Sequence, residues 1–195
     1  DGLDTYAKIF LNDSLILEVN NMFRTWEINV SQILKKENTL LIKFDSPNKI
    51  EKEKQAVLGY TLPGGERVFT RKPGFHYGWD WGPKITPSGI WRKVRLTAWN
   101  DCRIKNINII QNDLTSIHAS LTVNLEIESA SQKKITITAY DNFSEDFKLK
   151  KGHNNLSLNV QIQNPELWWP NGYGNQKLYE IVISVLDKNR ILDSQ

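Results

Sequence analysis

The second half of the chain alternates apolar and polar residues over long stretches, which is the pattern of half-buried β-strands. Apolar side chains recur at every second position, with serine, threonine, asparagine and glutamate between them. Turn-forming residues such as Asn171-Gly172 separate the runs. From about Asn100 onward, the pattern predicts an antiparallel sandwich of immunoglobulin-like type. The clearest alternating runs are residues 117–127, 135–139, 156–162 and 179–185.

The first half shows shorter alternating runs. Its predicted strands are residues 7–11, 15–19, 26–30, 40–44 and 94–96. Ser31 is expected to cap one helical turn that runs through Leu34. About five strands are thus predicted before Asn100, whereas a jelly-roll has about eight. We therefore expect a partial jelly-roll whose first strands precede Asp1.

Residues 45–89 show little strand pattern, and no stretch of the chain has a sustained helical period. A connection without regular structure rarely exceeds roughly 12–15 residues in a compact domain unless it serves a function. Within it, Glu-Lys-Glu-Lys at residues 51–54 is expected to form a solvated surface turn. A rigid β scaffold that carries a long aromatic-rich loop is typical of a binding site.

This stretch contains the run Gly-Trp-Asp-Trp-Gly-Pro at residues 78–83. Its flanking glycines and proline favour a shaped loop, and a carboxylate is costly to bury without a partner. Indole rings pack on the apolar face of a pyranose, while a fixed carboxylate accepts hydrogen bonds from its hydroxyls. The run is therefore a candidate sugar subsite, with Trp79 and Trp81 as its wall and Asp80 as the acceptor.

The same run has a structural alternative, in which Asp80 caps backbone amides and both indoles lie in the core. Residue spacing leaves the two interpretations equally open. In an extended segment Trp79 and Trp81 would share one face and Asp80 would point to the other, so a sugar site needs a twist there. Three cations precede the run and are candidates to pair with Asp80, although surface charge is their commoner role. They are Arg67, Arg71 and Lys72.

Two further aromatic groups carry weaker signals. His76 and Tyr77 lie beside the run, but no nucleophile is near them in sequence, which favours a packing role over acid–base catalysis. Residues 168–174, Trp-Trp-Pro-Asn-Gly-Tyr-Gly, are a second candidate sugar platform. Because their rings frame no carboxylate or amide, an aromatic plug against a neighbouring domain is the favoured interpretation.

Composition excludes several classes of function. The net charge is only +3 and the 25 basic residues are scattered, so nucleic acid is a poor candidate partner. Apolar runs are too short to span a membrane. Cys102 is the single cysteine and the three histidines have no metal-ligand spacing, so neither a disulfide framework nor a metal site is expected. No Ser/His/Asp set, P-loop or dinucleotide motif is present. The start at Asp1 suggests part of a longer protein and indicates no compartment.

One ordered series of segments spans nearly the whole chain. It comprises residues 1–7, 20–24, 71–73, 78–83, 89–92, 94–96, 165–174 and 176–179. Together these segments resemble the β-mannosidases of glycoside hydrolase family two. The Trp-Asp-Trp-Gly-Pro part is the most specific, because it favours β-mannosidase over the β-galactosidase and β-glucuronidase branches. The turn containing Gly172 is shared across the family.

The resemblance implies an N-terminal sugar-binding jelly-roll, an immunoglobulin-like sandwich and then a TIM barrel. Residues 1–99 would be a partial, galactose-binding-like jelly-roll, and residues 100–195 a sandwich lacking its last strand. The parent would be a retaining exo-β-mannosidase that hydrolyses terminal β-D-mannosyl residues of oligosaccharides without a cofactor. Both catalytic glutamates would lie on the barrel. We therefore expect no catalytic residue in this chain and no activity from it alone.

By the same resemblance, Asp80, Trp79 and Trp81 would contact the terminal mannose and select it rather than cleave it. The implied partners are the oligosaccharide and the missing barrel of the same parent. A partial jelly-roll exposes strand edges, so we expect the chain to self-associate. The alternatives are a free-standing carbohydrate-binding module, another family-two glycosidase, and a structural sandwich. The last predicts that Trp79 and Trp81 are fully buried.

Overall fold

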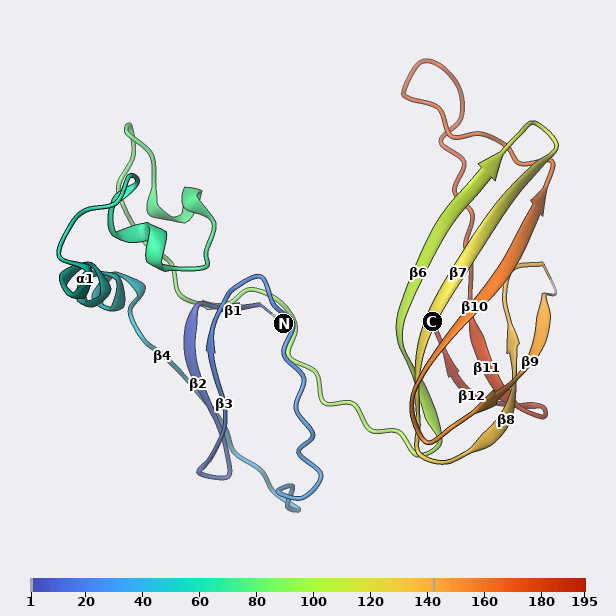
Figure 1. The fold of residues 1–195 in the computed structure, drawn as a ribbon, viewed down its shortest axis with the longest axis horizontal. Helices are drawn as coiled ribbons and strands as arrows, with labels where there is room; N and C mark the ends of the chain where they lie inside the picture. The colour runs from blue at the N-terminus through green and yellow to red at the C-terminus, as the bar shows by residue number, and fades with distance from the viewer. Residues whose placement is uncertain (1, 142) are drawn as a thin grey trace. The chain divides into compact units, whose positions relative to one another are not determined.

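The computed structural model describes residues 2–141 and 143–195; Asp1, where the family resemblance starts, and Asn142 lie outside this part. The chain divides into two compact units, one ending at Leu96 and one running from Thr97 to Gln195 (Figure 1). Domain limits at residues 99 and 100 stay a prediction. No helix in the described ranges is long and apolar enough to cross a membrane.

The first unit is built on an antiparallel sheet in the order β3-β2-β4. Its strands are β2 (Tyr6–Leu11), β3 (Ser14–Asn20) and β4 (Leu40–Phe44). In β2 the alternation is visible as burial, because Ala7 and Ile9 lie in the core with Val19 of β3. A second, two-stranded sheet pairs β1 (Leu3–Asp4) with β5 (Gly89–Ile90). This pairing joins the beginning of the unit to the end of its long loop region.

The loop region also contains a helix, which corrects the prediction of a surface turn at residues 51–54. These residues lie in α1 (Pro47–Leu58), followed by short 3-10 helices η1 (Gly65–Phe69) and η2 (Gly74–Tyr77). Pro47 stands in the first turn, where its missing N–H costs nothing. The helix lacks an apolar period because its most buried side chain is charged: Glu51 is only 2% exposed.

Three details of the predicted first half are wrong. Residues 26–30 and 94–96 form no strand, although they alternate. One turn does form near Ser31, but its amides from Ile33 and Leu34 donate to the Val30 carbonyl oxygen, and the Ser31 amide donates to the Asn29 side chain. Alternation alone does not make a strand, because a strand also needs a hydrogen-bonded neighbour.

The second unit is a sandwich of two antiparallel sheets, with strand orders β10-β7-β6 and β12-β11-β8-β9. Its core contains Val123, Ile137 and Leu158, all with no exposed surface. The all-β fold class, galactose-binding-like and then immunoglobulin-like, is confirmed. The strands are β6 (Cys102–Leu114), β7 (His118–Ser129), β8 (Lys133–Thr138), β9 (Ser144–Leu149), β10 (Gly152–Gln163), β11 (Ser184–Asp187) and β12 (Arg190–Ser194).

Alternation predicted β7, β8 and β10 but not every strand of the sandwich. The register of β6 shifts between Ile104 and Asn106 and again between Gln111 and Asp113, which breaks its period of two. The predicted strand at residues 179–185 begins only at Ser184, although Ile183 before it is fully buried. That the sandwich lacks a last strand stays a prediction.

Candidate functional site

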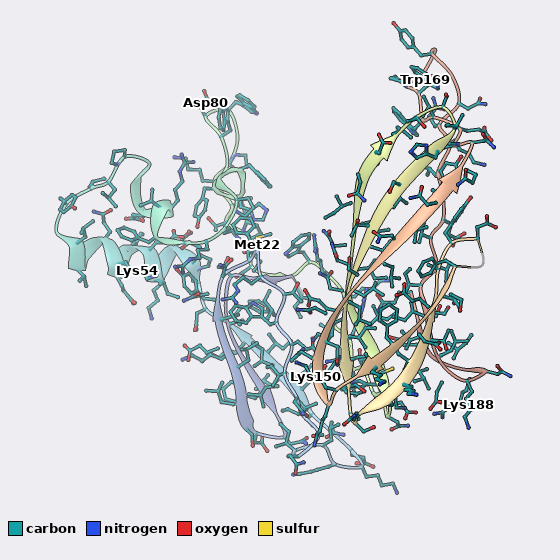
Figure 2. The ribbon with its side chains drawn as sticks, turned by 45° about the vertical axis from the view of Figure 1, so that its right-hand side comes forward. Met22, Lys54, Asp80, Lys150, Trp169 and Lys188 are labelled. Carbon is teal, nitrogen blue, oxygen red and sulfur yellow. The ribbon has the colours of Figure 1, made fainter. Side chains whose placement is uncertain are left out.

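The Trp-Asp-Trp run lies near the tip of an exposed loop, defined here as the aromatic loop (residues 73–88), where Figure 2 labels Asp80. The Trp79 side chain is 60% exposed and that of Trp81 is 85% exposed. Their ring centroids are 5.9 Å apart and the ring planes are tilted by 56°. These exposures contradict the alternative in which both indoles are buried in the core. The two rings instead form one angled apolar surface.

The backbone at Gly78 explains why glycine precedes this run. Gly78 has φ 82°, a left-handed conformation that side chains disfavour. A Cβ at this position would lie 3.1 Å from the Pro83 carbonyl oxygen and 3.3 Å from the Lys84 Cα atom. The two sides of the loop therefore approach each other closely at Gly78, and the tryptophans lie beyond this narrow point.

Lys72 is neither paired with Asp80 nor an ordinary surface charge, the two roles that the sequence left open for it. Lys72 Nζ instead donates to both carboxylate oxygens of Asp4, at 2.5 Å each, and to the Pro87 carbonyl oxygen at 2.7 Å. Both side chains are buried, with 0% of Lys72 and 6% of Asp4 exposed. Arg67 and Arg71 are exposed or partly exposed and have no described ion pair with Asp80. The Asp80 carboxylate is exposed and thus open to an external donor.

His76 and Tyr77 each have a separate partner. The Tyr77 hydroxyl donates a hydrogen bond to the buried carboxylate of Glu51. Burial raises the pKa of Tyr77, and the bond to Glu51 raises it further. His76 Nδ1 lies 3.5 Å from Asp4 Oδ2. Both residues thus pack the base of the aromatic loop, as the sequence favoured.

Sequence reasoning missed Asp4 as a site residue. Asp4 and Thr5 lie between the apolar residues Leu3 and Tyr6, and both are buried. Buried carboxylates need a partner, so a carboxylate in such a strand was the available signal. Its partner, Lys72, is far away in sequence and could be identified only from the fold.

The second aromatic run forms a hairpin loop in the second unit, where Figure 2 labels Trp169. The Trp169 amide donates to the Asn175 carbonyl oxygen at 2.9 Å, and Gln176 Nε2 donates to the Trp169 carbonyl oxygen at 2.8 Å. Trp168, Trp169 and Tyr173 are 55%, 46% and 80% exposed. That these rings form an aromatic plug against a neighbouring domain stays a prediction.

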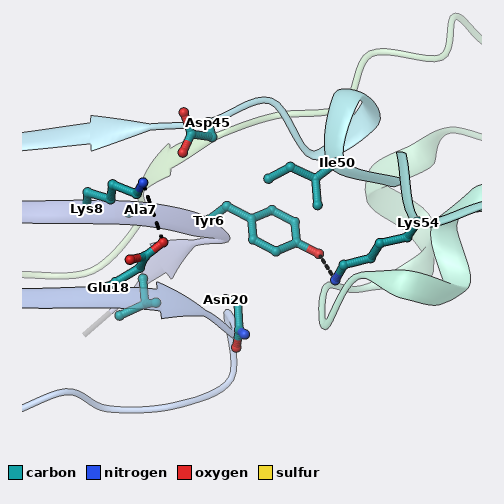
Figure 3. A pocket seen from close by; sticks show the side chains of 9 residues that line it. Tyr6, Ala7, Lys8, Glu18, Asn20, Asp45, Ile50 and Lys54 are labelled. Carbon is teal, nitrogen blue, oxygen red and sulfur yellow. Dashed lines mark hydrogen bonds and ion pairs between the residues drawn. The ribbon is translucent and has the colours of Figure 1, made fainter. Parts of the chain in front are cut away.

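A cavity of about 320 Å³ in the first unit is lined by residues of its three-stranded sheet and of helix α1 (Figure 3). Four of the polar side chains that line it have partners, namely Tyr6, Lys54, Lys8 and Glu18. The Tyr6 hydroxyl lies 3.2 Å from Lys54 Nζ and 3.1 Å from Thr70 Oγ1, and Lys8 Nζ lies 3.6 Å from Glu18 Oε1. None of the predicted site residues lines it. Within residues 2–141 and 143–195, no group of three His, Cys, Asp or Glu could hold a metal.

Two family models match the chain almost from end to end. Residues 1–92 match the glycosyl hydrolase 2 galactose-binding domain-like model, and residues 102–195 match the glycosyl hydrolases family 2 model. Beta-mannosidase B from Aspergillus niger is 33% identical over 197 residues, and that from Emericella nidulans is 32% identical over 204. Each match covers 95% of this chain but 23% of the relative, so the chain spans about a quarter of their length.

Solved structures agree with these matches. The beta-D-mannosidase from Dictyoglomus thermophilum is similar over 98% of this chain and 25% of its own, with a TM-score of 0.90 and 33% identity. The exo-chitosanase CsxA from Amycolatopsis orientalis is similar over 100% of this chain and 22% of its own, with a TM-score of 0.73 and 18% identity. The latter likeness concerns the fold alone.

Proposed function

This chain belongs to glycosyl hydrolase family 2, and we propose that it is the N-terminal, non-catalytic part of a retaining exo-β-mannosidase. The parent protein would hydrolyse terminal β-D-mannosyl residues of oligosaccharides. The supporting observation is that sequence similarity to beta-mannosidases extends across both units. The exo-chitosanase, whose name gives another activity, shares the fold at much lower identity.

The chemistry of hydrolysis belongs to the remainder of the parent. A retaining glycosidase needs two carboxyl groups about 5–5.5 Å apart that are free to act as nucleophile and acid/base. The buried carboxylates of the first unit do not meet this requirement, because Asp4 is paired with Lys72 and Glu51 accepts from Tyr77. The partners we propose are therefore a mannoside and a catalytic barrel in the same protein.

Within this chain, we propose that Asp80, Trp79 and Trp81 contact the terminal mannose. The exposed carboxylate of Asp80 can accept hydrogen bonds from sugar hydroxyls, and the tilted indoles offer an apolar surface to the ring. The contribution of these residues is orientation and selection, which lower the barrier by holding the substrate in place.

The test is Asp80→Ala in the complete protein, with hydrolysis of an aryl β-mannoside as the assay. Loss of a charge-assisted hydrogen bond of about 1.5–3 kcal/mol lowers kcat/KM by about 10- to 100-fold. Glu53→Ala is the matched control, because it removes an exposed carboxylate from helix α1 of the same unit. Near-normal activity of Asp80→Ala would overturn the subsite. Preference for a β-galactoside or β-glucuronide would overturn the mannosidase assignment.

A further inference from the structure

The aromatic loop begins and ends at one buried ion pair. Lys72 immediately precedes the loop, and its ammonium contacts the Asp4 carboxylate on β1. The same ammonium donates to the carbonyl oxygen of Pro87, near the other end of the loop. One cation thus connects both ends of the loop to one strand.

A second set of contacts holds the C-terminal end of the aromatic loop on Asp4. The Ser88 hydroxyl donates to the Asp4 carbonyl oxygen at 3.0 Å. Gly89, the next residue, is the pairing partner of Asp4 between β5 and β1. Backbone pairing, a side-chain hydrogen bond and an ion pair therefore all meet at Asp4.

The Asp4 carboxylate has two further polar neighbours. The Thr5 hydroxyl donates to Oδ1 at 2.5 Å, and His76 in η2 places Nδ1 3.5 Å from Oδ2. His76 is itself part of the aromatic loop, so the carboxylate contacts Lys72 just before the loop and His76 in its first turn. The end of the loop is held by the Asp4 backbone and by Lys72. Removing one partner of a buried ion pair leaves an uncompensated charge and is strongly destabilising. The two residues of such a pair therefore stay together in the folded state.

We propose that Asp4 and Lys72 are positioning residues whose buried ion pair closes the base of the aromatic loop and fixes where Trp79, Asp80 and Trp81 project. The inference rests on the proposed function, since it assigns the sugar contact to the loop tip. Asp4 and Lys72 do not touch the sugar. They act through Asp80 by restricting the arrangements that the exposed loop can adopt.

The first test measures how readily the aromatic loop opens, and it needs no enzymatic assay. The rate of trypsin cleavage within the loop is followed in the 195-residue chain. Lys84 is an exposed cleavage site within the loop, and Lys36, in another exposed turn of the same unit, is the internal control. Asp4→Asn removes the charge, and Ser88→Ala is a milder variant that decides the test if Asp4→Asn does not fold. Cleavage after Lys84 should accelerate at least about fivefold, with cleavage after Lys36 changing less than about twofold.

Unchanged cleavage at Lys84 in the folded variant would overturn the proposal. Equal acceleration at Lys84 and Lys36 would also overturn it, because the pair would then stabilise the unit as a whole.

The second test asks whether Asp4 acts through Asp80, by a double-mutant cycle in the complete protein. Asp4→Asn should lower kcat/KM for an aryl β-mannoside at least about tenfold in the native background, but less than about threefold in the Asp80→Ala background. Equal losses in both backgrounds would refute positioning through Asp80. Glu18→Gln is the control, because it breaks an exposed ion pair with Lys8 and should change kcat/KM less than about twofold.

The two proposals fail in different ways. If the complete protein hydrolyses another β-glycoside instead, the mannosidase assignment is wrong. The double-mutant cycle of Asp4 and Asp80 is then measured with that substrate. The digestion of Lys84 depends on no substrate at all. A substrate error therefore leaves the positioning role open to refutation by either test.

Discussion

Glu51 is a buried charge on helix α1, and the Tyr77 hydroxyl donates a hydrogen bond to its carboxylate. Tyr77→Phe removes that donor and leaves the carboxylate desolvated. Hydrogen bonds to charged groups contribute about 1.5–3 kcal/mol, so the free energy of unfolding of the first unit should fall by that amount. Urea titration followed by circular dichroism measures it.

The matched control is Tyr60→Phe, since Tyr60 is 61% exposed and lies just after the same helix. It should change stability by less than about 0.5 kcal/mol. The pKa of Tyr77 is raised in the folded state, so its contribution is present below the ordinary tyrosine value and is lost as pH rises through the folded value. If Tyr77→Phe keeps the native alkaline loss of stability, this assignment is wrong.

Asp101 lies between two cations of the second unit, with Lys133 Nζ and an Arg190 guanidinium nitrogen each 2.7 Å from one of its oxygens. The hydrogen bond from Lys133 lowers the pKa of Asp101 below 3.8, and the same bond raises the pKa of Lys133. A lowered pKa stabilises the folded state above the ordinary aspartate value, and this stabilisation is lost as pH falls through the folded value.

The sandwich should therefore lose stability on acidification from about pH 6 to about pH 3, and Asp101→Asn should reduce that loss. Denaturation midpoints of the second unit at the two pH values measure the effect. Asp146→Asn is the control, because Asp146 accepts from the neutral Thr136 hydroxyl. Equal reductions in the two variants would contradict the role of the cations.

Among the elements, helix α1 depends on its C-terminal glycine. Gly59 has φ 79°, and its N–H donates to the Gln55 carbonyl oxygen. Gly59→Ala forces a side chain into the left-handed region, so the first unit should lose about 1–2 kcal/mol in its unfolding free energy. Gly74→Ala is the control, because it has no left-handed φ and nothing within 4 Å of an added Cβ. Equal stability of the two variants would refute the argument.

Alternation predicted strands such as β7, β2 and β10, because one face of each is buried. It failed at α1, where Glu51 takes the position that an apolar residue usually occupies. Hydrophobic periodicity assumes that buried positions are apolar, and a buried hydrogen-bonded carboxylate violates that assumption.

The candidate site could also be predicted only in part from the sequence. The composition of residues 78–83 was enough to single out Asp80 and the two tryptophans, because glycines and proline around aromatic residues mark an exposed loop. Residue types could not decide whether the indoles are buried, and they did not identify Asp4 as the partner of Lys72. The partner of Lys72 is set by the pairing of β1 with β5, a long-range contact that local sequence does not encode.

At the scale of the whole molecule, the outer face of the first sheet carries an exposed apolar patch beside the charged side chains of Lys8, Glu18 and Lys43. Phe10 of β2 pairs with Leu15 of β3 on one side and with Leu41 of β4 on the other. Leu15 and Leu41 are 53% and 57% exposed, and their strands are the edges of the sheet. Exposed apolar edge strands promote association between chains. We therefore predict that the isolated chain self-associates at concentrations on the order of 100 μM.

Sedimentation velocity over a concentration series measures this association. Leu41→Lys places a charge on the open edge and should shift the chain toward monomer, since edge lysines block strand pairing. Val57→Lys is the control, because Val57 is 90% exposed on helix α1, away from the sheet. A native chain that stays monomeric would contradict the prediction. If Leu41→Lys and Val57→Lys shift the chain toward monomer equally, the added net charge explains the shift and the edge contact is refuted. Only position 41 lies on the edge of the sheet.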